Sequence, residues 1–99
     1  MLNKLNDKLI SNLVKAIVSI NNEEECYAFL EDICTMSEIK SIAQRLEVAK
    51  MLEQGMVYSE IAQKTGSSTA TISRVKRALD YGTGGYRAVL ERFDENCEE

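Results

Sequence analysis

Proline, histidine and tryptophan are absent from the 99 residues, and two of these absences exclude particular structures. Because proline interrupts helices, a chain without it favours an all-α domain. Zinc is not expected, because the chain has no histidine and its three cysteines form no Cys-x-x-Cys pair. An odd number of cysteines also argues against a disulfide framework. We therefore predict a helical protein with no metal and no other cofactor.

Long apolar runs are missing too. No stretch approaches the roughly 18 unbroken apolar residues of a membrane span. Polar residues interrupt the first ten positions, where a signal peptide would need its apolar segment. We therefore expect a cytoplasmic protein without membrane contact. A chain of 99 residues makes one small domain, and its apolar content of 44% leaves exposed apolar surface that points towards oligomerisation.

The formal net charge of −4 has the wrong sign for a DNA-binding protein, but the charges are unevenly distributed. Residues 63–90 hold five basic side chains against Asp80 alone, which is a local charge of +4. Residues 1–62 and 91–99 are each acidic. Salt screens charges beyond about 10 Å, so the local charge decides whether a phosphate is attracted. The sequence therefore permits nucleic-acid binding in the basic region.

This region contains the most informative pattern, a predicted helix-turn-helix over residues 58–79, with the sequence YSEIAQKTGSSTATISRVKRAL. A short helix over 58–65 is followed by Gly66, which can adopt the positive φ that such a turn needs. A recognition helix follows over 68–79, capped by the hydroxyl of Ser67 or Ser68. One apolar stripe of this helix faces inward, made by Ile72, Val75 and Leu79.

The opposite face of the second helix predicts contact with DNA, because hydroxyls suit base edges and long cations suit phosphates. Phosphates would be held by Lys64 and the main-chain N–H groups of Ser67 and Ser68. Base edges would meet Thr69, Ala70, Thr71 and Ser73. Either role would suit Arg74, Lys76 and Arg77. Two positions depart from the usual pattern, since Thr65 and Ser67 flank the glycine where larger apolar residues often sit.

Apolar periodicity predicts two helices in the first 34 residues of the chain. Residues 2–20 form an amphipathic helix whose broad apolar face we expect to pack on a partner subunit. A capping box of Asn22 with Glu25 begins the second helix, which runs to about residue 34. Its inward side chains are Cys26, Tyr27, Leu30, Ile33 and Cys34. Phe29 lies off this stripe, and Cys97 would be an exposed thiol.

The third helix begins at a capping box of Thr35 with Glu38, runs to about residue 54, and ends at a left-handed Gly55. Its inward side chains are Ile39, Ile42, Ala43, Leu46, Ala49 and Leu52. After the helix-turn-helix, a glycine-rich turn precedes a last short helix over 86–93. An acidic tail occupies residues 94–99.

These residues resemble the Trp repressor family, and more narrowly its YerC/YecD branch of bacterial regulators. The most specific part is SIAQRLEVAKMLEQGMVYSEIAQKTGSSTATISRVKRAL, followed by YGTGGY, within a similarity covering about residues 23–93. The resemblance implies one six-helix domain over 1–93 that forms an intertwined homodimer through residues 1–55. Two recognition helices would then enter successive major grooves of double-stranded DNA.

The resemblance also implies an effector pocket. In the repressor, tryptophan lies between two arginines, matched here by Arg45 and Arg74, and a threonine matched by Thr35 helps to hold its carboxylate. Val75 replaces a glycine beside the indole, and Ala78 replaces a serine near the amino group. A lost hydrogen bond to a charged group costs about 1.5–3 kcal/mol, so these departures argue against tryptophan and leave the identity of any effector open.

Two functions are compatible with these observations. The first is a sequence-specific transcription regulator, a repressor by resemblance, which acts on DNA as a homodimer. The alternative is a helical dimeric protein-interaction module without direct DNA recognition, whose interface would be the acidic surface. An enzyme is not expected, because the sequence shows no catalytic constellation.

Overall fold

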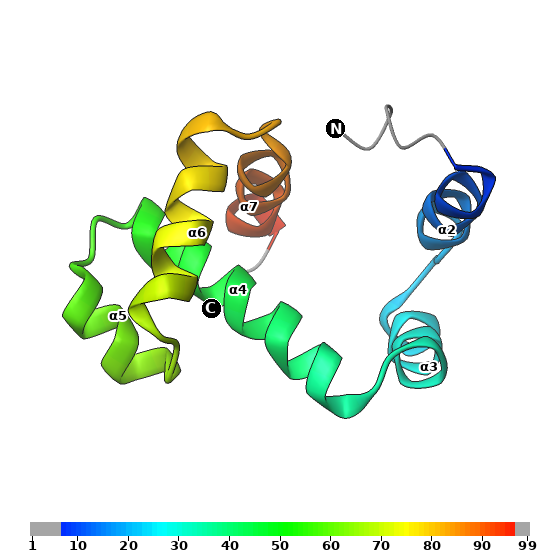
Figure 1. The fold of residues 1–99 in the computed structure, drawn as a ribbon. Helices are drawn as coiled ribbons and strands as arrows, with labels where there is room; N and C mark the ends of the chain where they lie inside the picture. Colours follow the sequence, from blue (N-terminus) through cyan, green and yellow to red (C-terminus); the bar gives the residue numbers. More distant parts are fainter. Residues whose placement is uncertain (1–6, 97–99) are drawn as a thin grey trace. The chain divides into compact units, whose positions relative to one another are not determined.

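The structure, a computed structural model, describes residues 7–96, and all the elements in that range are α-helices. The predicted all-α class is therefore confirmed. The helices are α2 (Lys8–Val18), α3 (Glu23–Ile33), α4 (Met36–Glu53), α5 (Tyr58–Thr65), α6 (Thr69–Tyr81) and α7 (Gly85–Asn96) (Figure 1). None of these helices is long and apolar enough to cross a membrane. The chain divides into two compact units, Met1–Met36 and Ser37–Glu99, so a single domain over 1–93 stays a prediction.

Short polar side chains begin both helices of the first unit. Asp7 caps α2 by accepting a hydrogen bond of 2.6 Å from the Leu9 N–H, and the predicted residues 2–6 lie outside the description. Asn22 caps α3 by accepting from the Glu25 N–H at 2.9 Å. The Glu25 carboxylate accepts from the N–H of Asn21 at 3.0 Å, one residue before the cap. The predicted start of α3 at Asn22 is confirmed, but Glu25 accepts from the N–H of Asn21 and not from that of the cap residue, as a capping box would require.

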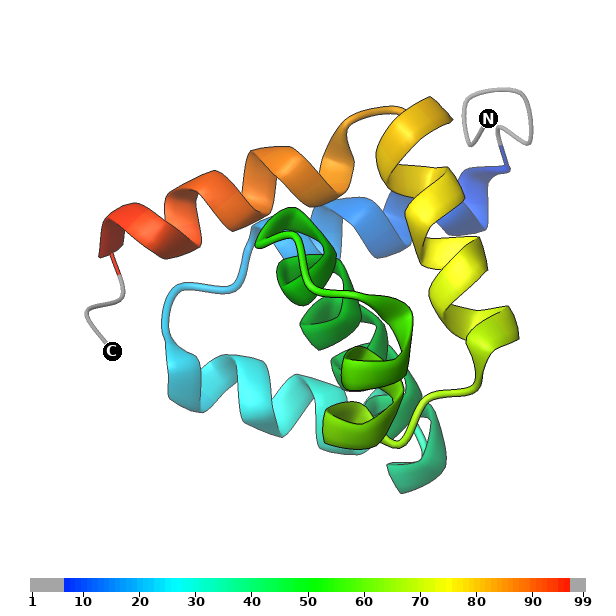
Figure 2. The ribbon, with the colours of Figure 1, turned by 90° about the vertical axis from the view of Figure 1, so that its left-hand side faces the viewer.

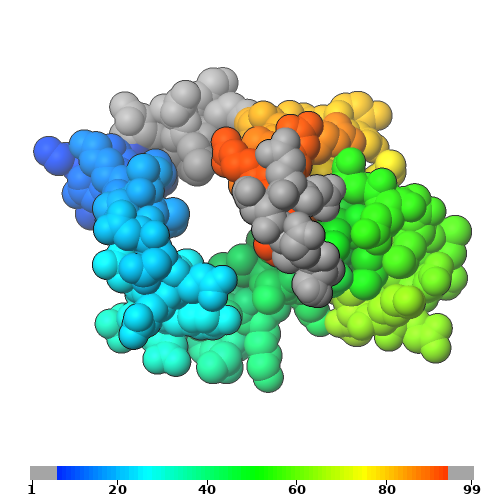
Figure 3. Space-filling view, turned by 180° about the vertical axis from the view of Figure 1, so that it is seen from behind, coloured from blue at the N-terminus to red at the C-terminus, as the bar shows by residue number. Residues whose placement is uncertain are grey.

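The two helices of the first unit, which run in opposite directions (Figures 1 and 2), contain no buried residue in the described range. Three of the predictions for α3 are wrong. Tyr27 and Ile33, expected inward, are 71% and 52% exposed, while Phe29, expected off the stripe, is half-buried. Cys26 and Cys34 are free and half-buried rather than core residues, and Cys97 lies outside the description. This pair of helices (blue to cyan in Figure 3) therefore has no buried core of its own among the described residues.

The second unit has one core, to which all four of its helices contribute, with α4 at its centre (Figure 2). The buried apolar residues are Val48, Ala49, Ile61, Ile72, Val75, Leu79 and Leu90. Val48 is fully buried although the predicted stripe of α4 omitted it, whereas Ile42 and Ala43 were expected inward and are exposed. Only residues in the second half of α4 belong to the core. The prediction of one inward apolar stripe along the whole helix is therefore wrong.

The end of α4 is built as predicted, around a left-handed glycine. Gly55 has a φ of 83°, its N–H donates to the Leu52 carbonyl, and the N–H of Met56 donates to the Met51 carbonyl. This pair of bonds is a Schellman motif, which satisfies carbonyls that the helix leaves without partners. The same end of α4 holds α7, through a 2.8 Å ion pair between Glu53 and Arg87. α7 is longer than the predicted 86–93 and includes the first residues of the expected tail.

Candidate nucleic-acid interface

The helix-turn-helix is present, with boundaries that differ slightly from the prediction. Gly66 ends α5 with φ 76° and ψ 8°, and its N–H donates to the Ala62 carbonyl at 2.8 Å. Residues other than glycine rarely adopt this conformation, which explains the glycine at the turn. Ser68 is the cap of α6 and not its first residue, and the helix continues to Tyr81, two residues beyond the predicted end.

The threonine beside the glycine takes part in a network of hydrogen bonds. The hydroxyl of Thr65 donates to the Ile61 carbonyl at 2.8 Å and accepts from the N–H of Ser67 at 3.1 Å. The carbonyl of Thr65 accepts from the side-chain amide of Gln44, on α4, at 2.8 Å. The turn is thus held by hydrogen bonds, which accounts for a threonine where larger apolar residues often sit.

Ser67 does not fit the predicted role of holding a phosphate. The residue is only 6% exposed, and its N–H already donates to the hydroxyl of Thr65. The hydroxyl of Ser67 is buried and has no hydrogen-bond partner within the described part of the chain. Burial and the occupied N–H therefore remove Ser67 from the surface that DNA could reach.

Ser68 is the capping residue that the sequence left undecided between two serines. Its hydroxyl accepts from the N–H of Thr71 at 3.1 Å and lies 3.2 Å from the Thr71 hydroxyl. Thr71 is half-buried on the flank of α6 that faces α4, so its hydroxyl is partly engaged within the protein. The exposed residues of the first turn are Thr69 and Ala70.

The two faces of α6 are separated as predicted. Ile72, Val75 and Leu79 are buried, and the exposed face carries Thr69, Ala70, Ser73, Arg74, Lys76 and Arg77. Lys76 makes an ion pair of 3.5 Å with Asp80, so Arg74 and Arg77 are its cations without an ion pair in the described range. Lys64, at the end of α5, is also exposed.

Sequence reasoning missed one exposed residue of this face, Tyr81, which is 82% exposed at the end of α6. It follows Arg77 by four positions and Arg74 by seven, so the three share one face of the helix. That spacing was visible in the sequence, but the predicted helix ended before it.

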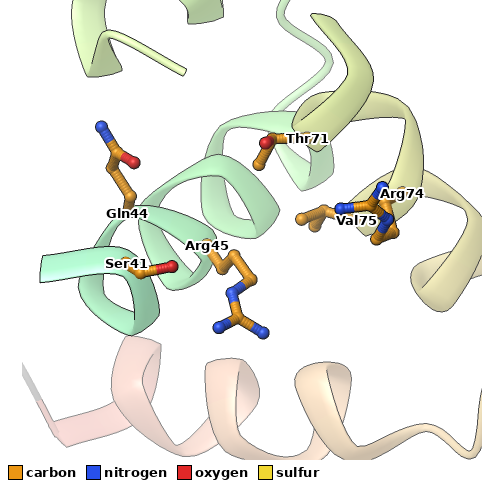
Figure 4. Close-up of a pocket in the computed structure, with 6 residues that line it drawn as sticks. All are labelled: Ser41, Gln44, Arg45, Thr71, Arg74 and Val75. Carbon is orange, nitrogen blue, oxygen red and sulfur yellow. The ribbon is translucent and has the colours of Figure 1, made fainter. Parts of the chain in front are cut away.

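A pocket of about 270 Å³ lies between α4 and α6 (Figure 4). Its lining residues are Ser41, Gln44 and Arg45 from α4, and Thr71, Arg74 and Val75 from α6. The structure therefore brings together two of the three residues predicted for an effector pocket, Arg45 and Arg74. Thr35 belongs to the first unit, so its place in such a pocket stays a prediction.

Comparisons with known proteins agree on one family. A family model described as Trp repressor protein matches residues 8–94. The uncharacterized protein YerC of Bacillus subtilis (strain 168) is 51% identical over 98 residues, covering 99% of this chain and 94% of YerC. A crystal structure of a candidate Trp repressor from Staphylococcus aureus superposes with a TM-score of 0.89 at 48% identity, covering 95% of this chain and 94% of that one. The crystal structure of a TrpR-like protein from Eubacterium eligens ATCC 27750 superposes with a TM-score of 0.88 at 50% identity, covering 98% of this chain and 99% of that one.

Proposed function

Because the chain belongs to the Trp repressor family and has its all-α fold, we propose that it is a sequence-specific transcription regulator that binds double-stranded DNA as a homodimer. The family is one of regulators and not of enzymes. The carrying observation is α6 itself, whose buried stripe holds it on the core while its opposite face is exposed, polar and cationic.

DNA recognition would begin at the first turn of α6. Ser68 caps the helix, which leaves Thr69, Ala70 and Ser73 exposed at the spacing of one helix face. Short side chains let a helix approach base edges closely, and a helix N-terminus favours a phosphate nearby. Since these residues offer few bidentate pairs with bases, much of the specificity would come through water or DNA shape.

Phosphate contacts would come from the cations beside that reading face. Arg77 and Lys64 are exposed, and no ion pair involves either of them among the described side chains. Arg77 lies four residues after Ser73, on the same side of α6. Cations at the edge of a reading face fix the register of a protein on the duplex.

The homodimer is supported by the uncovered apolar surface of the first unit. The exposed apolar residues of α2 are Leu9, Leu13, Val14, Ile17 and Val18. A helix with this much apolar surface gains by covering it, at about 25 cal/mol per Å² buried. A second copy of the chain would cover these faces and would place two α6 helices for two half-sites about one DNA turn apart.

Selection from a random DNA library, followed by gel shifts with the enriched site, tests the proposal. We expect a palindromic site and a strong dependence on salt. Arg77→Ala and Thr69→Ala should each weaken binding, whereas Arg87→Ala, which removes the same charge from α7, should change it little. Unchanged affinity in the first two variants would contradict this map of the interface. No binding to any DNA at low salt would favour the protein-interaction module.

A further inference from the structure

We propose that Gln44 is a positioning residue for DNA reading, which does not contact the DNA but holds α6 in the orientation that selective recognition requires. Its side-chain amide donates a hydrogen bond of 2.8 Å to the main-chain carbonyl of Thr65, the residue that ends α5. Gln44 lies on α4, outside the helix-turn-helix. This inference rests on the proposed function, because it assigns a further residue to the action of the same helix.

The amide of Gln44 meets the turn at two neighbouring residues. Besides its bond to the carbonyl of Thr65, its Nε2 atom lies so close to Gly66 that a Cβ atom on this glycine would be 3.7 Å from it. Gln44 also lines the pocket between α4 and α6, but Figure 4 shows its amide pointing away from the side chain of Arg45. The direction of this side chain therefore follows from its bond to the turn.

The turn that Gln44 contacts is held by hydrogen bonds at three successive residues. The carbonyl of Thr65 lies in the last turn of α5, where carbonyls have no partner within the helix, and it accepts from Gln44. The N–H of Gly66 donates to a carbonyl of α5. The N–H of Ser67 donates to the hydroxyl of Thr65, which itself donates to α5. The bond from Gln44 connects this segment with α4.

The turn sets the direction in which α6 leaves α5. Ser68 caps α6 directly after the turn, and the exposed face that would read DNA begins at the next residue, Thr69. The buried apolar stripe holds α6 on the core, but apolar packing is not directional, whereas hydrogen bonds are. Hydrogen bonds to base edges need distances of about 3 Å, so a small displacement of the first turn of α6 would weaken them.

Selective and unselective DNA binding depend on this orientation to different degrees. Attraction between cations and phosphates supplies most of the binding to unrelated DNA, and it tolerates small displacements. Contacts with base edges do not. Loss of the bond from Gln44 should therefore reduce the affinity for the selected site and leave the affinity for unrelated DNA nearly unchanged. A residue needed only for folding would reduce both affinities, because less of the protein would be active.

Gel shifts with full-length Gln44→Met test the inference, because methionine is similarly long and unbranched but has no N–H donor. We expect the ratio of the affinities for the selected site and for unrelated DNA to fall by at least about fivefold, the factor for one neutral hydrogen bond. The slope of log K against log salt should equal that of the wild type, since no cation is lost. Gln54→Met is the matched control, since it replaces an exposed glutamine just after α4, and it should keep the wild-type ratio. Circular dichroism of both variants should show unchanged helical content.

Thr65 supplies a second test within the turn. Thr65→Val removes the hydroxyl that accepts from the N–H of Ser67, and it should lower the same ratio of affinities. Thr65→Ser keeps a hydroxyl at this position and should keep the ratio of the wild type. Equal ratios in the two variants would contradict the role that the inference gives to the turn.

The ratio of affinities also separates failure of this inference from failure of the proposed function. An equal fall in affinity for both DNAs in Gln44→Met would overturn the inference, because direct contact with a phosphate or partial unfolding would explain it. A wild-type protein that prefers no sequence would refute the proposed function. Wild-type selectivity that Gln44→Met retains in full would refute this inference alone.

Discussion

The side-chain amide of Gln44 donates a hydrogen bond of 2.8 Å to the main-chain carbonyl of Thr65, 21 residues later in the chain. Thr65 is the last residue of α5, where helix carbonyls have no partner within the helix. The bond therefore ties the central helix α4 to the turn that orients α6. Through this contact, the orientation of α6 depends on Gln44, a residue outside the helix-turn-helix.

Gln44→Ala should lower the free energy of unfolding by about 1 kcal/mol, because it removes this bond and leaves the Thr65 carbonyl to solvent. Urea denaturation followed by circular dichroism would measure the loss. Gln63→Ala is the control, since Gln63 is an exposed glutamine on α5, and it should change stability by less than about 0.5 kcal/mol. Equal effects of the two substitutions would show that the bond contributes nothing.

Replacing the two adjacent serines of the turn should have opposite effects on stability. Ser67→Ala removes a buried hydroxyl that has no hydrogen-bond partner among the described residues, and it should stabilise the fold by about 1 kcal/mol. Ser68→Ala removes the cap of α6 and should destabilise it by about 1 kcal/mol. The two variants lose the same atom, so each serves as the control for the other. Urea midpoints that move in the same direction would contradict this assignment.

A charge placed on the apolar face of α2 should disrupt the proposed dimer. Ile17 is 51% exposed and lies four residues after Leu13 and eight after Leu9, on one helix face. Ile17→Glu should give a monomer, or a chain with reduced helical content, at concentrations where the wild type sediments as a dimer. Asn12→Glu adds the same charge at an exposed polar position of α2 and should leave the dimer intact. A stable Ile17→Glu dimer would place the interface elsewhere.

The local signals in the sequence predicted the motif and its ends well. The glycine of the turn, the cap of α3 and the left-handed Gly55 all act within a few residues, and the structure confirms each. The buried stripe of α6 was also predictable, because its spacing matches the helix period. Membership of the Trp repressor family was predictable from the same part of the sequence, and the comparisons confirm it.

Longer-range features could not be read in the same way. The periodicity of α4 did not show that the core starts only in its second half, so Val48 was omitted and Ile42 was included. Tyr27 and Phe29 exchanged their expected places because the short α3 has no core of its own to select a face. The burial of Ser67 depends on how α5 and α6 pack on α4, which its neighbours in sequence do not specify.

The sequence by itself determined that this protein is helical, where its helices begin and end to within a few residues, and that a capped, cationic helix follows a glycine turn. Those properties depend on backbone preferences and on side chains three or four positions apart. Only the tertiary structure decided which serine is buried, that Gln44 holds the turn, and that Arg45 and Arg74 line one pocket. These relationships join residues on different helices, and the packing of those helices on a shared core sets which of their side chains meet.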